Sequence, residues 1–306
     1  MQLDTLNERF TPAGQVGFRT NPDGLLFADI DNAHASASLC LQGGHLTTWC
    51  PKDQTQPVVW LSPAARFAPG KSIRGGVPVC WPWFGPHATQ SAFPAHGFAR
   101  ATAWEVTGAA ALDTGATRIG LALVPNNATR AQWPAETRLE LVATVGAQLR
   151  IDLTTTNLGR DDIVIGEALH TYFAIGDIGD IQLLGLEGCR YLDKVDGGAR
   201  KTQHGPITCA GEIDRVYLDT AAECVISDPG YRRRIRIAKS GSQSTVVWTP
   251  WTDKAGKMGD FGPGRHGQGG WREMVCVESA NAAENTVTVP AGGRHTLSVV
   301  YSVESL

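Results

Sequence analysis

Two residues suited to proton transfer each stand at the end of an apolar run in this 306-residue sequence. His170 lies in EALHTYF, where Leu169 and Tyr172 indicate that its ring is partly buried. Burial would lower the pKa of this imidazole and suit it to donating or accepting a proton near neutrality. Glu278 follows the apolar run in MVCVESAN. A carboxylate at the end of a buried strand is either a proton-transfer group or a structural cap, and its position alone leaves both open.

Arginine is the other residue type that suggests chemistry, because its planar guanidinium donates two parallel hydrogen bonds to phosphate or carboxylate. The chain has 20 arginines and only 7 lysines. Codon bias explains most of that excess. Two arginines have an informative context, since Arg74 precedes two glycines in SIRGGVPVCWPWFGPH and Arg100 ends FPAHGFAR. Individual arginines such as these are candidate anion ligands.

The same two segments carry further candidates. Trp81, Trp83 and Phe84 offer flat apolar surface that could stack on the C–H face of a sugar ring, or they could form a buried aromatic corner capped by Arg74. His96 precedes a glycine on a predicted tight turn, and it is either a structural histidine or a site residue.

Composition excludes several classes of partner and cofactor. With 27 basic and 30 acidic side chains the formal net charge is −3, which excludes broad attraction to nucleic acid or to membranes. Histidines and carboxylates show no metal-ligand spacing, and no nucleotide-binding glycine motif or nucleophile elbow occurs. We therefore expect a site without metal or cofactor.

Cysteine usage and the absence of export signals predict a cytoplasmic protein. The seven cysteines are an odd number and no two are spaced as C-x-x-C, unlike a disulfide framework or a zinc site. The first residues, MQLDTLNERF, do not resemble a secretory leader. No apolar run approaches the ~18 residues of a membrane span.

The elements that must position these side chains are predicted to be strands. Helical periodicity is almost absent, whereas short alternating or β-branched runs recur between glycine, proline, asparagine and aspartate. They cover residues 25–30, 118–124, 139–145, 149–157, 163–167, 235–238, 245–248, 274–278, 285–289 and 296–303. This pattern predicts an all-β fold, a large antiparallel β-sandwich or barrel, as one domain over residues 1–306.

The densest positive run, YRRRIRIAKS at residues 231–240, is also predicted to be a strand. Its alternation places Arg232, Arg234 and Arg236 on one cationic face. We expect a solvated outer strand or a sheet edge, because charges at an edge oppose aggregation.

Six segments taken in order resemble one family. IRGGVPVCWPWFGPH, AHGFAR, LHTYF, GEIDRVY, VVWTPWTDKAGKMGDF and VCVESAN are similar to the glucose-6-phosphate 1-epimerase (hexose-6-phosphate mutarotase) branch of the aldose 1-epimerase superfamily. The matching segments run from about Ile73 to Asn281. The resemblance implies a galactose-mutarotase-like sandwich of supersandwich type. It also implies a cofactor-free interconversion of the α and β anomers of a hexose 6-phosphate, most simply D-glucose 6-phosphate.

The resemblance further implies roles for individual residues. His170 in HTYF matches the family's general acid, and Glu278 in VCVES matches its general base. Arg74 and Arg100 match ligand-binding arginines, for which the 6-phosphate is the natural partner.

Two more residues match positions that contact the sugar in the family, and two positions depart from its pattern. Asp214 in EIDRVY matches an acidic residue that binds sugar hydroxyls, and His96 matches a histidine that faces the ring oxygen in the sugar-only mutarotases. Ala95 stands where some members have glutamine, and Ser279-Ala280 follow the base where some have Pro-Gly. Both departures could alter sugar preference.

Other functions stay open at this point. A mutarotase for unphosphorylated aldoses would keep the same acid and base, and would differ in whether Arg74 and Arg100 bind a phosphate. A non-catalytic carbohydrate-binding or sugar-phosphate-binding protein could lose one of the pair, so the presence of both His170 and Glu278 argues against it. A glycoside hydrolase would need two carboxylates across the bond it cleaves. The expected partner is a small-molecule hexose phosphate, and we expect a monomer.

Overall fold

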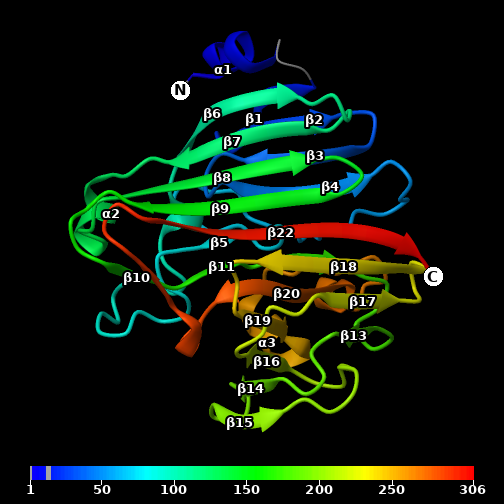
Figure 1. Cartoon of the computed structure of the whole chain (residues 1–306). Coiled ribbons are helices and arrows are strands. Elements are labelled where there is room, and N and C mark those ends of the chain that lie inside the picture. Colours follow the sequence, from blue (N-terminus) through cyan, green and yellow to red (C-terminus); the bar gives the residue numbers. More distant parts are fainter. Residues whose placement is uncertain (1, 12–14) are drawn as a thin grey trace.

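The computed structural model describes residues 2–11 and 15–306, and its regular structure is mainly β-sheet (Figure 1). Every ladder between two strands is antiparallel. The expected all-β fold with antiparallel sheets is therefore confirmed.

One broad sheet of eight strands runs along the whole molecule (Figure 1). In spatial order its strands are β13 (Gln182–Leu184), β17 (Cys224–Asp228), β18 (Arg233–Ser240), β22 (Arg294–Ser305), β9 (Leu149–Asn157), β8 (Thr137–Val145), β7 (Thr117–Leu123) and β6 (Trp104–Ala111).

A second sheet of eight strands carries the candidate proton-transfer residues. Its order is β15 (Ala199–Thr202), β14 (Arg190–Asp193), β16 (Ile213–Tyr217), β19 (Ser244–Thr249), β20 (Met274–Asn281), β11 (Glu167–Leu169) and β5 (Val79–Cys80), with β12 (Tyr172–Ala174) also paired to β20.

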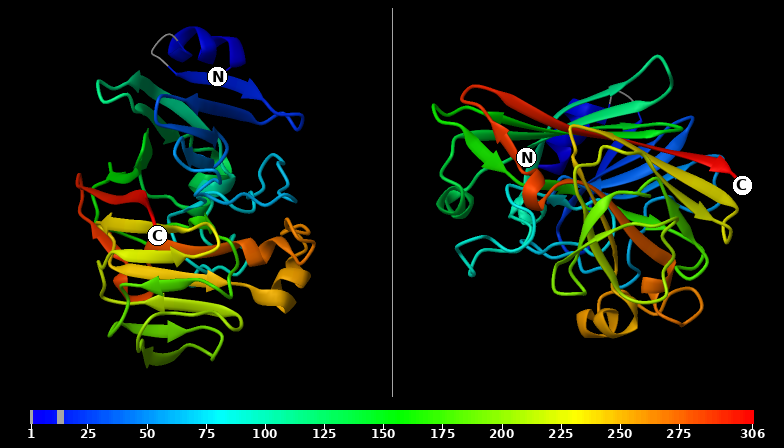
Figure 2. Two further views of the ribbon diagram at one scale, coloured as in Figure 1. Left: turned by 90° about the vertical axis from the view of Figure 1, so that its right-hand side faces the viewer. Right: turned by 60° about the horizontal axis from the view of Figure 1, so that its bottom comes forward.

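Smaller elements complete the fold. A four-stranded meander holds β1 (Val16–Thr20), β2 (Leu26–Asp31), β3 (Ala35–Cys40) and β4 (His45–Pro51), and β10 (Ile163–Ile165) pairs with β21 (Val287–Val289). The helices are α1 (Leu3–Phe10), α2 (Asn127–Gln132) and α3 (Trp251–Met258), with 3₁₀ turns at Ala99–Ala101, Gly270–Glu273 and Ala283–Asn285. Figure 2 shows α3 (orange) projecting from the half of the molecule that holds the second eight-stranded sheet. Among the described residues no helix is long and apolar enough to cross a membrane.

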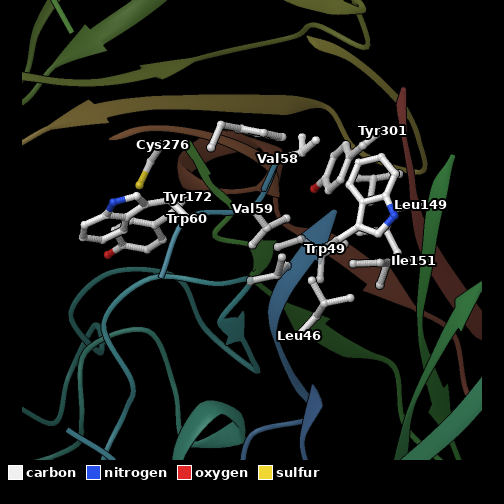
Figure 3. Packing of buried hydrophobic residues seen from close by; sticks show 14 of the residues in the cluster. Leu46, Trp49, Val58, Val59, Trp60, Leu149, Ile151, Tyr172, Cys276 and Tyr301 are labelled. Atoms are coloured by element: carbon white, nitrogen blue, oxygen red, sulfur yellow. The ribbon is translucent and has the colours of Figure 1, made fainter. Parts of the chain in front are cut away.

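The broad sheet packs on both other large sheets, which makes the molecule an extended sandwich. Trp49 of β4 lies against Leu149 and Ile151 of β9 (Figure 3), and its Nε1 donates to the Gly146 carbonyl over 3.2 Å. Beside them Tyr301 of β22, which pairs with Leu149, meets Phe173 of β12 with ring centroids 5.0 Å apart. These contacts give the sheets one continuous apolar core.

Local alternation predicted the strands that line this core. Leu149 and Ile151 are completely buried, as are Leu297 and Tyr301 on β22. Burying side chains of this size contributes roughly 1.5–3 kcal/mol each. Alternation works here because one face of each strand meets the core and the other meets solvent.

Three expectations need correction. The segment 163–167 is not one strand, because the chain turns at Gly166 and its two halves pair with different partners, β21 and β20. The predicted run 285–289 begins as a 3₁₀ turn and is a strand only over Val287–Val289. The cationic segment 231–240 does have a solvated face, but β18 is not a sheet edge, since it pairs with β17 and β22.

Several short strands, including β3, β12 and β14, escaped prediction because their residues are buried on both faces or too few to alternate.

Candidate functional site

His170 and Glu278 meet where one strand ladder is interrupted. Leu169 of β11 pairs with Ser279 of β20, and Tyr172 of β12 pairs with Cys276 of β20. Between these pairs the chain leaves the ladder, and the His170 amide donates to the Pro78 carbonyl over 3.0 Å. The interruption places Nε2 of His170 3.2 Å from Oε1 of Glu278. The predicted acid and base therefore lie side by side.

Burial determines how this pair is protonated. The exposed fraction of the side chain is 12% for His170 and 1% for Glu278. Desolvation is the main cause that lowers the pKa of His170 well below its usual range, with His96 and Arg100 adding to the effect. Desolvation also raises the pKa of Glu278 well above its usual range, and Asp214 adds to it. Both shifts favour the neutral form of each group, in which the pair holds one proton, on Glu278.

The two side chains keep unused hydrogen-bonding capacity. Nδ1 of His170 and Oε2 of Glu278 are both buried and find no hydrogen-bond partner within the described ranges 2–11 and 15–306. Leaving buried polar atoms unpaired costs about 1–3 kcal/mol each. Such atoms in a cleft are typical of groups that a ligand satisfies.

A stack of aromatic rings fixes the imidazole. The Tyr172 ring lies almost parallel to the His170 ring, with 13° between their planes and 5.1 Å between centroids. Trp60 stacks on the other side of Tyr172 at 6.0 Å (Figure 3). Nη1 of Arg74 donates to the Tyr172 hydroxyl over 2.7 Å, and Nε of Arg74 donates to Oδ1 of Asp260 over 3.0 Å. Arg74 thus holds the stack that orients His170.

His96 enters the site on a turn with a left-handed backbone. Its φ is +66°, and the next residue is a glycine because a Cβ there would lie 1.9 Å from the Trp81 carbonyl oxygen. Nδ1 of His96 faces the Gly85 amide at 3.4 Å. Burial, helped by Arg100 and Lys194, lowers its pKa to about 3. A neutral imidazole whose Nδ1 accepts carries its hydrogen on Nε2, so His96 can donate that hydrogen to a ligand oxygen.

One cleft of about 310 Å³ brings together all six residues predicted from the sequence. They are Arg74, His96, Arg100, His170, Asp214 and Glu278. Asp214 reaches the cleft from β16, and burial raises the pKa of its carboxyl group. Two larger hollows of about 510 and 520 Å³ lie elsewhere, and across the described residues neither is lined by a histidine.

Sequence reasoning missed part of the lining. Tyr172 and Trp248 stood inside motifs already singled out, so their aromatic character was the available signal. Lys254 on α3 lies in the same motif as Trp248, whereas Lys194 after β14 lies outside every motif singled out from the sequence; both line the cleft.

Of the three aromatic residues expected to stack on a sugar, only Phe84 lines this cleft. Trp81 is 2% exposed and packs edge-on against Phe98 and Trp133 in the core. A buried aromatic corner is therefore the correct description of Trp81. Arg74 does not cap it, because its guanidinium lies over the Phe261 ring at 5.0 Å.

The described part of the chain holds no group of three or more histidine, cysteine, aspartate or glutamate side chains arranged to bind a metal ion. The cleft itself is lined by ionisable groups. It offers one shared proton, a neutral donor in His96 and several cations.

Comparisons with known proteins agree with this geometry. A sequence family described as aldose 1-epimerase matches residues 28–302. The chain is 37% identical, over 83% of each sequence, to an Escherichia coli K12 protein named "Putative glucose-6-phosphate 1-epimerase". The crystal structure of a "putative mutarotase" from Salmonella typhimurium superposes with a TM-score of 0.87, covering 97% of this chain and 96% of that one at 32% identity.

A structure with lower sequence identity supports the fold and nothing more. A galactose mutarotase-like protein from Clostridium acetobutylicum matches with a TM-score of 0.69 at 11% identity, covering 95% of this chain and 98% of that one. The galactose-mutarotase-like sandwich expected from the sequence is confirmed.

Proposed function

The chain belongs to the aldose 1-epimerase family, and we propose that its substrate is a hexose 6-phosphate, most simply D-glucose 6-phosphate, whose α and β anomers it interconverts. One observation carries this proposal. A buried imidazole and a buried carboxyl group lie 3.2 Å apart inside a cleft that is also lined by four cationic side chains.

The chemistry suits a pair that shares one proton. Ring opening needs one proton removed from the C1 hydroxyl and one delivered to the ring oxygen. Both oxygens are bonded to C1, so the acceptor and the donor must be neighbours, as His170 and Glu278 are. In the tautomer of the pair that carries its shared proton on His170, Glu278 takes the hydroxyl proton and His170 gives its proton to the ring oxygen, so the C1–O bond of the ring breaks and an aldehyde forms.

Reclosure uses the same groups in reverse. After rotation about C1–C2, Glu278 returns a proton to the aldehyde oxygen while His170 takes the proton from the C5 hydroxyl. The pair ends with the proton on His170, as it began, so the cycle needs no outside acid or base. The rotation requires the rest of the substrate to stay anchored, and arginines that bind the 6-phosphate would provide that anchor.

Substitution of each member of the pair tests the proposal. We expect His170→Ala and Glu278→Gln each to lower the rate of enzymatic anomerisation by roughly 10²–10⁴-fold, the usual contribution of one proton-transfer group. Exchange NMR between the two anomers of glucose 6-phosphate measures the rate, and circular dichroism checks the fold.

The matched control is His204→Ala, which removes an exposed histidine outside the cleft. Near-normal rates in both site variants would contradict the assignment of acid and base. Rates for glucose, galactose and their 6-phosphates measured side by side decide the substrate, since preference for the free sugars would identify a mutarotase of unphosphorylated aldoses.

We further propose that the enzyme works in the cytoplasm and as a monomer. All seven cysteines are free thiols, which suits a reducing compartment. The net charge of −3 argues against a nucleic acid as partner and is compatible with a single small phosphate.

A further inference from the structure

The four cations of the cleft differ in whether a carboxylate already neutralises them. Arg74 donates to Asp260 over 3.0 Å. Lys254 lies 2.7 Å from Glu212 and 3.8 Å from Asp214. These two positive charges are therefore compensated within the protein.

Arg100 and Lys194 are not compensated in this way. Within residues 2–11 and 15–306 neither side chain takes part in an ion pair. Arg100 donates through Nη2 to the Ala95 carbonyl over 2.8 Å, which uses one of its five N–H groups. Nζ of Lys194 lies 5.5 Å from the centre of the Phe84 ring. Among the described residues, Arg100 and Lys194 are thus the two cations of the cleft that no carboxylate pairs with.

The backbone holds Lys194 in place although its side chain is exposed. Lys194 follows β14 directly, and its amide donates to the Asp214 carbonyl of β16 over 2.8 Å. The Phe84 ring beneath its ammonium group also contacts His96 edge-on, with ring centroids 4.6 Å apart. Lys194 and His96 therefore flank the same aromatic ring.

Both charges act on the groups near the reacting atoms. After burial, Arg100 and Lys194 are the causes that lower the pKa of His96. After burial and Asp214, Lys194 and Arg100 act on Glu278, where they oppose the rise of its pKa. A ligand anion that reached both cations would lie within the cleft.

We propose that Lys194 is a specificity-determining residue that, together with Arg100, binds the phosphate group of the substrate. This inference rests on the proposed function and adds a ligand that the motifs did not indicate. A phosphomonoester carries a charge of about −1.5 to −2 at pH 7, which the two uncompensated cations match. Arg74, whose charge Asp260 already balances, serves mainly to hold Tyr172 and through it His170.

Lys194→Met tests the proposal by comparing two substrates. We expect kcat/KM for glucose 6-phosphate to fall by about 10- to 100-fold, the effect of losing one charge-assisted hydrogen bond. The loss for glucose, which reports only the effect of the Lys194 charge on His96 and Glu278, should be much smaller, and Lys194→Arg should restore most of the preference for the phosphate. The matched control is Lys257→Met, which removes the same charge from an exposed position of α3 outside the cleft.

A second measurement separates this inference from the proposed function. Inorganic phosphate, followed by calorimetry, should bind the wild-type protein at least tenfold more tightly than Lys194→Met. Unchanged phosphate affinity, or equal losses of kcat/KM for both substrates, would overturn the role of Lys194. Weakened phosphate binding in a protein that does not act on hexose 6-phosphates would leave that role intact and reject the substrate.

Discussion

At the scale of single residues, burial and not charge pairing sets the state of the reacting groups. His170 and Glu278 are close enough for an ion pair, but desolvation opposes the charged form of each and shifts their pKa values toward the neutral forms. A pair with one shared proton can both donate and accept, which a pair with two protons or with none could not. The tight packing of His170 between Tyr172 and Glu278 thus also tunes its chemistry.

This state has a measurable pH dependence. We expect the His170 ring of the ligand-free protein to stay neutral as the pH falls through 6.5 and to gain its second ring proton only well below that value, because its pKa is lowered by burial. NMR of the histidine Cε1–H signals over pH 5–8 measures this, with Glu278→Gln and His170→Ala used for assignment.

The pKa shifts of His170 and Glu278 also make the free energy of unfolding depend on pH. In the unfolded chain His170 takes up a proton near pH 6.5, so its burial lowers the unfolding free energy as the pH falls below that value. Glu278 acts in the opposite direction, since its raised pKa lowers the unfolding free energy as the pH rises above about 4.5. A His170 signal that titrates at 6.5 in the folded protein would contradict the neutral pair.

At the scale of elements, the cationic strand β18 carries a buried arginine on one face and solvent-facing arginines on the other. Arg233 is 2% exposed, and its guanidinium donates to the carbonyls of Gln56, Pro57 and Ala174 over 3.1, 2.9 and 2.7 Å. Arg234, the next residue, is exposed and lies 4.0 Å from Glu304. Arg233 therefore holds residues 56–57 and the end of β12 against β18, whereas Arg234 forms a loose surface pair.

Substituting these neighbours compares the two kinds directly. We expect Arg233→Met to lower the free energy of unfolding by about 3–5 kcal/mol. The substitution leaves buried carbonyl groups without a hydrogen-bond donor, and it leaves the buried Asp228, 3.8 Å away, without its cation. Arg234→Met should change it by less than about 0.5 kcal/mol. Urea denaturation followed by fluorescence gives both values, and similar losses in the two variants would show that Arg233 has no special structural role.

At the scale of the whole molecule, the broad sheet joins the two halves of the chain. It reaches from β6 over the N-terminal meander to β13 beside the second eight-stranded sheet, and β22 in its middle pairs with both β9 and β18 (Figure 2). The apolar core is continuous across this joint. We therefore expect residues 1–306 to unfold as one unit.

The free cysteines provide probes at both ends of the molecule. Cys40 lies in the meander and Cys276 lies under the candidate site, and both are completely buried. We expect the two thiols to become reactive at the same urea concentration, as measured by pulsed thiol labelling and mass spectrometry. The half-buried Cys50 and Cys189 should react already in the native protein. Labelling of Cys276 well before Cys40 would instead show two domains.

The sequence by itself determined the strands with a clear two-residue alternation, and it singled out His170 and Glu278 as candidate proton-transfer residues within short motifs. Leu149 and Ile151 on β9 were predicted to share a buried face, and they do. Local apolar context marked His170 and Glu278 as candidates and left the role of Glu278 open; the roles of acid and base came from the resemblance of HTYF and VCVES to one family.

Only the tertiary structure decided which cations are free to bind an anion. Arg74 meets Asp260 across 186 residues of chain, and that contact removes it from the pool of uncompensated charges. Lys194 reaches the cleft because β14 pairs with β16. The interior position of β18 follows in the same way from its pairing with β22. Local patterns record which face of an element is buried, whereas the net charge of a site depends on pairings between distant segments that no local pattern specifies.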